Sequence, residues 1–338
     1  MNDSSTTPAP HGTPASHDGL DPEIREFVRR MSERWRQHPS LSSVPLPEAR
    51  GIAEKVREIW TQGGPVMART TELQIPCGEG TVRIRVLDPQ ADSAKPALVY
   101  LHGGGWTIFS IDTHDRLMRE YAARAGIAVV AVDYSLSPEV RFPRAIDETL
   151  AVVHWLREHG QEIGIDPDHI AVGGDSAGAA MTLAVCMSLR DAGQGEAVSA
   201  MLLNYGAFDA ACDTSSYDRY GNGGYMWDSG EMLAFWHNYL ADYPNESRHP
   251  LACPIHADVS GLPPAFMCIP ECDVMFDESL EMAERLRRAG NLTQAVIYPG
   301  ATHSFLEAVS IARVADRAFE EASRWLSDML RPRPLPGA

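Results

Sequence analysis

Ser176 lies in a stretch of small residues that separates two apolar runs of different character. The run before it, Ile170 to Val172, is short and β-branched, which is typical of a strand, while the run from Ala179 to Ala184 has helical spacing. With Gly174 and Gly178 the serine forms the pattern G-x-S-x-G. In that pattern a sharp turn exposes the hydroxyl and points a helix N-terminus toward it. The pattern predicts a serine nucleophile; an ordinary glycine-rich turn is the alternative.

Three consecutive glycines follow an earlier apolar run, in the segment LHGGGWTIFS. Glycines let backbone amides face a developing negative charge without a Cβ atom in the way. Alone they could form a flexible turn. Combined with a serine at a strand-to-helix turn further along the chain, they predict an oxyanion hole built from the amides of Gly104 and Gly105, with the amide of Ala177 after the serine.

A serine hydroxyl needs a base to accept its proton, and a histidine base needs a carboxylate to fix its tautomer. In hydrolases with such a serine, the chain order is serine, acid, histidine. His303 follows the last apolar run and is the predicted base, and Asp273, after the preceding run, is the predicted acid. Asp277 is the alternative acid, although we expect it to cap a helix that begins near Glu278.

Other titratable residues compete for these roles less well. Asp175 adjoins the serine, but a neighbour across a sharp turn points elsewhere. Three histidines precede the strand that leads to the predicted acid, in the wrong chain order for the base: His237, His249 and His256.

The elements around these residues alternate between apolar runs and helical patterns. Near-continuous apolar runs such as ALVYL, IAVVAV and AMLLNY are typical of strands covered on both faces, whereas TELQIP and TVRIRVL alternate like an antiparallel hairpin at a sheet edge. The intervening helices are predicted over 144–159, 176–190, 278–289 and 308–330. The sequence therefore predicts an α/β fold, with a mostly parallel central sheet flanked by helices and a site at the carboxyl ends of the strands.

Two segments depart from this alternation and are predicted to form a helical cap over the strand ends. One is 21–65, with two helical patterns, and the other is 209–254, which is rich in aromatic residues and long for a loop. The core is then divided into 66–208 and 255–331, after a tail over 1–20 whose composition predicts disorder. Trp227 and Trp236 from the cap, with Trp106 beside the glycines, are predicted walls of a substrate pocket; simple packing is the alternative for each.

Composition excludes several classes of function. The chain of 338 residues has 46 acidic and 29 basic residues and a formal charge of −17, which opposes binding to nucleic acid or to an anionic membrane. It has neither a cationic, apolar leader nor eighteen consecutive apolar residues, so we expect a cytoplasmic protein. The six cysteines lack metal-binding spacing, so we expect reduced, mostly buried thiols and no metal or cofactor.

Five blocks in order, HGGGW, VDYSLSPEVRFP, GGDSAGA, CDVMFDES and YPGATHSF, give the chain its family resemblance. From about Ala97 onward it resembles the bacterial hormone-sensitive-lipase family of α/β-hydrolases, most closely the acetyl-esterase branch. The resemblance implies an α/β-hydrolase fold, Ser176 as nucleophile, His303 as base and Asp273 as the acid that orients it. It also implies short acyl chains, from acetyl to butyryl.

The blocks depart from the family pattern at three positions. Val274 stands where proline usually follows the acid, Ser135 replaces an arginine, and Ser304 replaces the glycine after the histidine. None of these changes removes a catalytic group. The first affects the rigidity of the acid loop, and the second the bracing of the loop from Asp133 to Glu139.

The expected function is hydrolysis of short acyl esters through an acyl-enzyme, with a small-molecule ester as the partner. A lactone, carbamate or aryl-amide hydrolase with the same residues is the alternative. A non-catalytic receptor on the same fold is a further alternative, disfavoured because His303 is present. A homodimer is possible, since relatives of this fold often pair through an edge strand or its flanking helix.

Overall fold

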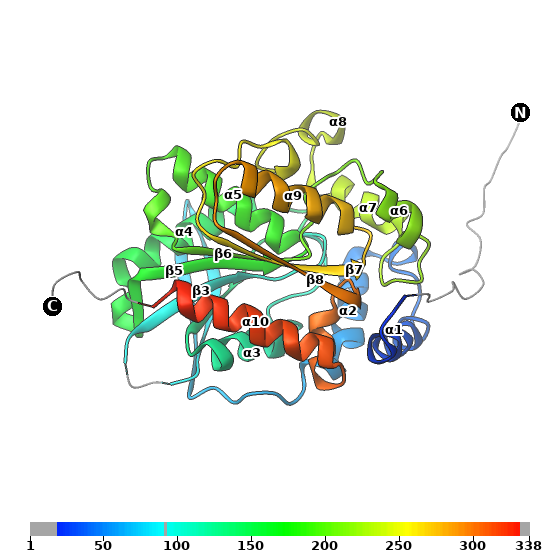
Figure 1. Cartoon of the computed structure of the whole chain (residues 1–338), viewed down its shortest axis with the longest axis horizontal. Helices are drawn as coiled ribbons and strands as arrows, with labels where there is room; N and C mark the ends of the chain where they lie inside the picture. The colour runs from blue at the N-terminus through cyan, green and yellow to red at the C-terminus, as the bar shows by residue number, and fades with distance from the viewer. Residues whose placement is uncertain (1–18, 91–92, 332–338) are drawn as a thin grey trace, which may run out of the picture.

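The computed structural model describes residues 19–90 and 93–331, which form one mixed sheet covered by helices. The sheet has eight strands in the order β1-β2-β4-β3-β5-β6-β7-β8 (Figure 1). These strands are β1 (Arg69–Cys77), β2 (Gly80–Asp88), β3 (Lys95–Leu101), β4 (Ala128–Asp133), β5 (Ile165–Asp175), β6 (Ala200–Asn204), β7 (Ala265–Cys272) and β8 (Thr293–Thr302). β1 pairs antiparallel with β2 and β2 with β4, while every later pair is parallel. The predicted mostly parallel sheet with an antiparallel hairpin at its edge is confirmed.

Helices cover both faces of the sheet, which explains why its inner strands, such as β3 and β6, are apolar on both sides. One face carries α3 (Asp115–Ala125) and α10 (Arg313–Met329), and the other carries α4 (Arg144–His159), α5 (Ala177–Asp191) and α9 (Phe276–Arg288) (Figure 1). Along β3, Val99 and Leu101 pack in one core while Leu98 and Tyr100 pack in the other, and all four are fully buried. This is the alternation that a doubly covered strand requires.

The predicted start of the last helix is wrong. The last helix begins at Arg313 rather than at 308, because residues 305–310 form a separate 3-10 helix, η5 (Phe305–Ser310), and Ala312 is extended with φ −119° and ψ 118°. The predicted disordered tail falls mainly on residues 1–18, outside the described residues. Residues 19 and 20 are described, and Leu20 is buried; the boundary of the tail stays a prediction.

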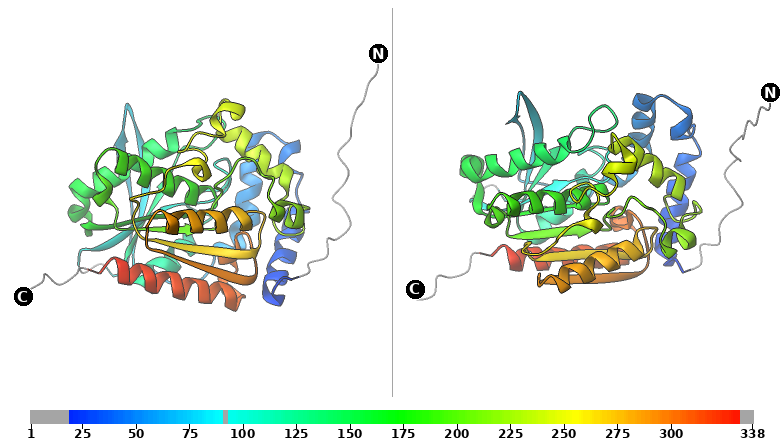
Figure 2. Two further views of the ribbon diagram at one scale, coloured as in Figure 1. Left: turned by 45° about the horizontal axis from the view of Figure 1, so that its top comes forward. Right: turned by 90° about the horizontal axis from the view of Figure 1, so that it is seen from above.

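The remaining helices gather at one end of the sheet, beyond the carboxyl ends of the parallel strands (Figure 2). They are α1 (Pro22–Trp35) and α2 (Leu46–Thr61) from the N-terminal segment, and α6 (Ser215–Tyr220), α7 (Ser229–Tyr239) and α8 (Tyr243–Glu246) from the segment between β6 and β7. Local sequence fixes where two of them begin: Asp21 caps α1 by accepting from the amide of Glu23, and Asp228 and Glu231 form a reciprocal capping box on α7. The boundaries of the two cap segments stay predictions.

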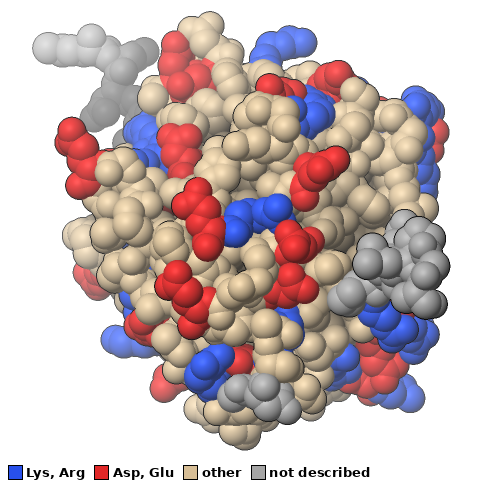
Figure 3. Space-filling view, turned by 90° about the vertical axis from the view of Figure 1, so that its left-hand side faces the viewer, with Lys and Arg blue, Asp and Glu red and all other residues tan. Residues whose placement is uncertain are grey.

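The surface mixes charges of both signs. On the face shown in Figure 3, acidic and basic side chains of the described residues lie interleaved. Among the helices of residues 19–90 and 93–331, none has the length and apolar character needed to cross a membrane. All six cysteines are unpaired, and five of them are buried.

Candidate active site

Ser176 occupies the turn between β5 and α5, with φ 54° and ψ −118°. A positive φ is uncommon for a residue with a Cβ atom and marks local strain, as the glycine-serine pattern predicts. The neighbouring glycines are required by close packing against β3. A Cβ atom at Gly178 would lie 1.9 Å from the carbonyl oxygen of Leu101, and one at Gly174 would lie 2.3 Å from the same oxygen. The small residues therefore allow helix α5 to start directly against the sheet.

His303 and Asp273 meet at the ends of β8 and β7. The Nδ1 atom of His303 lies 2.8 Å from Oδ2 of Asp273, and both side chains are at most 2% exposed. Oδ1 of the same carboxylate accepts from the amide of Met275 at 3.1 Å, which fixes the orientation of the carboxylate. The ring of Tyr205 meets the imidazole edge-on, with centroids 4.9 Å apart. The pair leaves Nε2 of the imidazole as the nitrogen available for a further partner.

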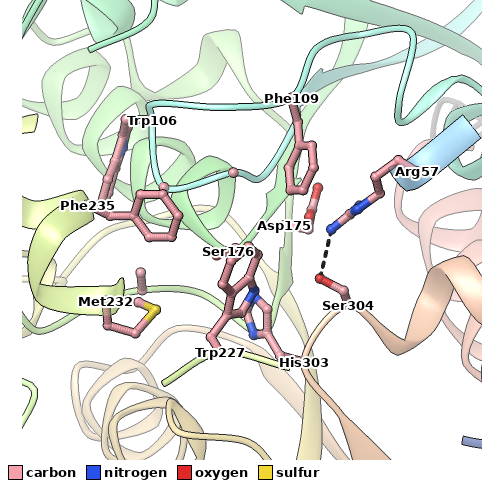
Figure 4. A pocket seen from close by; sticks show the side chains of 13 residues that line it. Arg57, Trp106, Phe109, Asp175, Ser176, Trp227, Met232, Phe235, His303 and Ser304 are labelled. Atoms are coloured by element: carbon pink, nitrogen blue, oxygen red, sulfur yellow. Dashed lines mark hydrogen bonds between the residues drawn. The ribbon is translucent and has the colours of Figure 1, made fainter. Parts of the chain in front are cut away.

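Ser176 and His303 line one pocket, and they lie at its centre in Figure 4. In the described chain no hydrogen bond joins the two side chains, a spacing that is common before substrate binds. The structure thus brings together Ser176, His303 and Asp273, the three residues predicted as nucleophile, base and acid, and their catalytic roles stay predictions. Asp277, the alternative acid, lies in the first turn of α9, where its carboxylate accepts from the amide of Ser216 at 2.8 Å. It does not cap the helix, because the N-cap position is Met275 and makes no side-chain cap.

The glycine segment after β3 borders the same pocket. Gly104 has φ 122° and Gly105 has φ 57°, and both line the pocket beside Ser176. Within the described residues neither amide donates a hydrogen bond to another group, so both remain available to a ligand. Ala177 is the first residue of α5 and therefore has no acceptor one turn earlier. Gly104 and Gly105 thus line the pocket with Ser176, and Ala177 directly follows the serine; an oxyanion hole formed by these three amides stays a prediction.

The carboxylate of Asp175 contacts Gly103, Tyr100 and His114, whereas a catalytic acid would need to contact His303. Its Oδ1 accepts from the amide of Gly103 at 3.0 Å and from the hydroxyl of Tyr100 at 2.9 Å, while Oδ2 lies 3.4 Å from Nε2 of His114. Burial alone would raise its pKa, but the charges of His114 and Arg57 and the hydrogen bonds hold the pKa below the ordinary value. Asp175 is therefore a buried carboxylate that ties the glycine segment to the serine turn.

Aromatic side chains from the cap and from the glycine segment form the wall of the pocket. Trp106 lines it and stacks on Tyr239 with centroids 4.1 Å apart and an interplanar angle of 6°, and Trp227 also lines it. Trp236 does not, which corrects the sequence-based expectation: it is fully buried behind Trp106, with ring centroids 4.5 Å apart. Simple packing, the alternative given for this residue, is what the structure shows.

Apart from Asp175, which was weighed only as an acid, six lining residues were missed by the sequence analysis: Arg57, Phe109, Ala207, Met232, Phe235 and Ser304. For one of them a signal was present. In α2 the buried positions include Ala53, Val56 and Trp60 at helical spacing, and Arg57 falls within that apolar stripe. A charged residue on the buried face of an amphipathic helix needs a partner inside the protein.

The three positions that depart from the family blocks make the following contacts. The amide and hydroxyl of Ser135 both donate to the buried Glu148, at 2.8 and 2.7 Å, so a carboxylate braces this loop. The carbonyl of Val274 accepts from the hydroxyl of Ser216 at 2.7 Å, which holds the acid loop from the cap side. Ser304 has φ 60°, a conformation that favours glycine, and its hydroxyl accepts from Arg57 at 3.2 Å.

One group of metal-ligating side chains occurs within the residues that the structure describes. Asp209, Cys253 and His256 bring ligand atoms within 4.8 Å of one another. None of the three lines the pocket that holds Ser176.

Comparisons with known proteins agree with this fold. Residues 98–307 match the family model described as the alpha/beta hydrolase fold. The chain is 36% identical over 240 residues to an ethyl acetate hydrolase of Pseudomonas putida, covering 70% of this chain and 75% of that protein. It is 33% identical over 285 residues to an acetyl esterase of Salmonella agona strain SL483, covering 82% of this chain and 85% of that protein.

Solved structures give the same result. A hyperthermophilic esterase from the archaeon Pyrobaculum calidifontis superposes with a TM-score of 0.86 at 30% identity, covering 92% of this chain and 99% of that one. A thermostable esterase from Pseudomonas putida ECU1011 gives a TM-score of 0.87 at 28% identity, covering 94% of this chain and 99% of that one. By class the protein is a carboxylic ester hydrolase. The chain belongs to the α/β-hydrolase family related to hormone-sensitive lipase, as its sequence blocks predict.

Proposed function

We propose that the protein is a serine carboxylesterase that hydrolyses small-molecule esters of short acyl chains through an acyl-enzyme. The observation that carries the proposal is the pocket that Ser176 shares with His303, whose imidazole is held at 2.8 Å by the carboxylate of Asp273. A strained serine turn, an oriented imidazole and free backbone amides in one pocket are together the parts that acyl transfer requires.

In the acylation step Oγ of Ser176 attacks the ester carbonyl carbon, and Nε2 of His303 accepts the hydroxyl proton. The intermediate then collapses, the bond between the carbonyl carbon and the alcohol oxygen breaks, and His303 gives its proton to that oxygen. Asp273 stabilises the imidazolium that forms between the two transfers and keeps Nδ1 protonated. The products of this step are the free alcohol and an acylated Ser176.

In the deacylation step water replaces the alcohol. The oxygen of the water attacks the acyl carbon while His303 accepts a proton from that water. The bond between the acyl carbon and Oγ of Ser176 then breaks, His303 returns the proton to Oγ, and the carboxylic acid leaves. In both steps the carbonyl oxygen becomes an oxyanion, which the amides of Gly104, Gly105 and Ala177 would bind. Loss of one such donor costs about 3 to 4 kcal/mol of transition-state stabilisation in enzymes of this type.

The packing of the cap over the glycine segment supports a preference for short acyl chains. A Cβ atom at Gly105 would lie 2.2 Å from the ring of Phe235, so this ring lies directly over the backbone of the predicted oxyanion hole. Met232 and Trp106 line the pocket beside it. The names of the two relatives, an ethyl acetate hydrolase and an acetyl esterase, also support acetyl-type substrates.

The test is turnover of p-nitrophenyl esters from acetate to octanoate by the wild type and by Ser176→Ala. We expect hydrolysis that is highest for acetate to butyrate and falls for longer chains, and only a trace of activity in the variant. Substantial activity in Ser176→Ala would contradict the assignment of Ser176 as the nucleophile. A wild type that turns over a lactone, carbamate or aryl amide far better than any ester would keep the residues but change the substrate class.

A further inference from the structure

Arg57 reaches from α2 of the N-terminal segment into the pocket of Ser176. Its side chain is only 2% exposed, yet it lines the pocket together with Ser304, Phe109 and Asp175. Figure 4 shows its guanidinium on the opposite side of Ser176 from Trp106 and Phe235. Burying an arginine in this way is costly unless its donors find acceptors.

The contacts of Arg57 account for only part of its hydrogen-bonding capacity. One terminal nitrogen donates to Oγ of Ser304 at 3.2 Å, and the other forms an ion pair with Glu307. The guanidinium carbon lies 3.9 Å from the ring centroid of Phe109, so the ring packs on the cation. A guanidinium carries five N–H groups, and Nε is buried without a partner among the described residues. The pocket wall thus holds buried donors that a bound molecule can satisfy.

The charges around Arg57 determine what kind of acceptor fits. Glu307 is 4% exposed and pairs with the guanidinium, and Asp175 and Glu54 also act on its charge. Burial outweighs these carboxylates and lowers the pKa of Arg57 to about 10, so the group is still cationic at neutral pH. A carboxylate on a bound molecule would be repelled by Glu307 and Asp175 as well as attracted by Arg57. A neutral oxygen acceptor can use the free donors without that repulsion.

The position of Arg57 relative to His303 indicates which part of an ester it would face. Arg57 contacts Ser304, the residue directly after His303. In the proposed reaction His303 protonates the leaving oxygen, so the alcohol part of the ester must lie on the His303 side of Ser176. The opposite side, lined by Trp106, Met232 and Phe235, is apolar and suits the acyl group.

We propose that Arg57 binds a neutral oxygen acceptor on the alcohol part of the substrate. The preferred substrates are then short-chain esters of alcohols that carry an ether, hydroxyl or carbonyl oxygen a few bonds from the ester oxygen. This inference rests on the proposed esterase function and adds to it the chemical class of the alcohol. In this role Arg57 determines specificity and takes no part in bond making.

The experiment compares two acetate esters that differ only by an oxygen in place of a methylene, 2-methoxyethyl acetate and butyl acetate. A second pair, ethyl methoxyacetate and ethyl butyrate, puts the same change in the acyl part. For each pair the ratio of kcat/KM values is divided by the ratio of the alkaline hydrolysis rates, which removes intrinsic reactivity. A loss of folded protein lowers the apparent kcat/KM of both esters by the same factor and leaves these ratios unchanged.

The test variant is the double variant Arg57→Met, Glu307→Gln. It removes both charges of the ion pair together, so that Glu307 is not left as an unpaired buried carboxylate. Lys55→Met, an exposed position on the same helix, is the control and should behave as the wild type. In the wild type we expect the first corrected ratio to favour the methoxy ester by about tenfold or more, since a hydrogen bond to a charged group contributes that much. The double variant should lose the preference.

Three results would overturn the inference. The first is a corrected ratio near one for the first pair in the wild type, a measurement that holds even where the double variant fails to fold. The second is a preference that survives in a folded double variant, and the third is a preference seen only with the acyl pair. A wild type that hydrolyses none of the four esters would instead contradict the proposed function itself.

Discussion

The carboxylate of Asp175 accepts a hydrogen bond from the amide of Gly103 at 3.0 Å, and this contact joins the two halves of the pocket. Asp175 precedes the serine of the elbow, and Gly103 precedes the two glycines whose amides face the pocket. Oxyanion stabilisation depends on amides held in place before the reaction begins. A buried carboxylate therefore links the position of the serine turn to that of the predicted amide donors.

Asp175→Asn should lower kcat about ten- to a hundredfold with little change in KM, because an amide side chain cannot hold the amide of Gly103, the Tyr100 hydroxyl and His114 as a carboxylate does. Steady-state kinetics with p-nitrophenyl acetate measure this. Asp166→Asn, at the other end of β5, is the matched control and should leave kcat unchanged. Equal kcat in the Asp175 variant and the wild type would show that the contact has no catalytic consequence.

Asp273→Asn should lower kcat by about 10⁴-fold, because the amide favours the wrong imidazole tautomer. Asp277→Asn tests the alternative acid from the sequence analysis. Since Asp277 contacts Ser216 and Arg219 and not His303, its variant should keep nearly all activity. The reverse order of effects in kinetic measurements would reassign the acid.

Phe235→Ala should shift the acyl preference toward longer chains, because the ring packs over Gly105 and its removal opens the acyl side of the pocket. The ratio of kcat/KM for p-nitrophenyl hexanoate over acetate is expected to rise about tenfold. Leu233→Ala, on the same helix but not in the pocket lining, should leave that ratio as it is. An unchanged ratio in the Phe235 variant would place the acyl group elsewhere.

Glu278→Gln should make the protein more stable relative to the wild type as pH rises. Glu278 is buried, and burial together with the nearby charge of Asp209 raises its pKa well above the ordinary value of 4.5. The folded state then binds its proton more tightly than the unfolded chain does. The wild type therefore loses free energy of unfolding as pH rises from about 4.5 toward the folded pKa. Glutamine keeps an acceptor for the amides of Phe208 and Asp209 but does not titrate.

Urea unfolding at a series of pH values measures the effect of Glu278→Gln. Glu281→Gln, at an exposed position of the same helix, controls for the loss of one negative charge. If the difference in free energy of unfolding between Glu278→Gln and the wild type does not grow with pH, ionisation of Glu278 does not destabilise the folded state.

Two glycine-to-alanine changes should act in opposite directions. A Cβ atom at Gly51, inside α2, meets nothing within 4 Å, so Gly51→Ala should raise the free energy of unfolding by about 0.5 to 1 kcal/mol. At Gly178 the same atom would lie 1.9 Å from the Leu101 carbonyl oxygen, so Gly178→Ala should reduce stability and displace Ser176. Thermal melting and esterase activity distinguish the two, and a neutral Gly178→Ala would contradict the packing described for the elbow.

The sequence predicted the sheet, the elbow and the three residues proposed for catalysis because each depends on local pattern and chain order. Ser176, Asp273 and His303 each directly follow a strand, and the carboxyl ends of parallel strands lie at one edge of the sheet. Arg57 was missed because its role depends on contacts with Ser304 and Glu307, about 250 residues away along the chain. No periodicity in α2 contains that information.

The failures at Trp236 and Asp277 have a similar cause. The aromatic-rich composition of the cap suggested Trp236 as a pocket wall but could not show that Trp106 separates it from the pocket. Proximity to a helix start suggested a cap for Asp277, but the helix begins two residues earlier than predicted, at Phe276. The carboxylate of Asp277 instead accepts a hydrogen bond from the amide of Ser216 in the cap segment. The positions of both side chains depend on packing between segments that are distant in the sequence. Such packing determines the pocket wall more than it determines the reacting groups.

The most direct measurement of the central claim is to treat the intact protein with a fluorophosphonate and locate the adduct by peptide mass spectrometry. Only an activated serine forms this adduct readily. We expect a single adduct on the peptide containing Ser176, absent from Ser176→Ala and strongly slowed in His303→Ala. An adduct on another residue, or none on folded wild-type protein, would contradict the proposal that Ser176 and His303 act together.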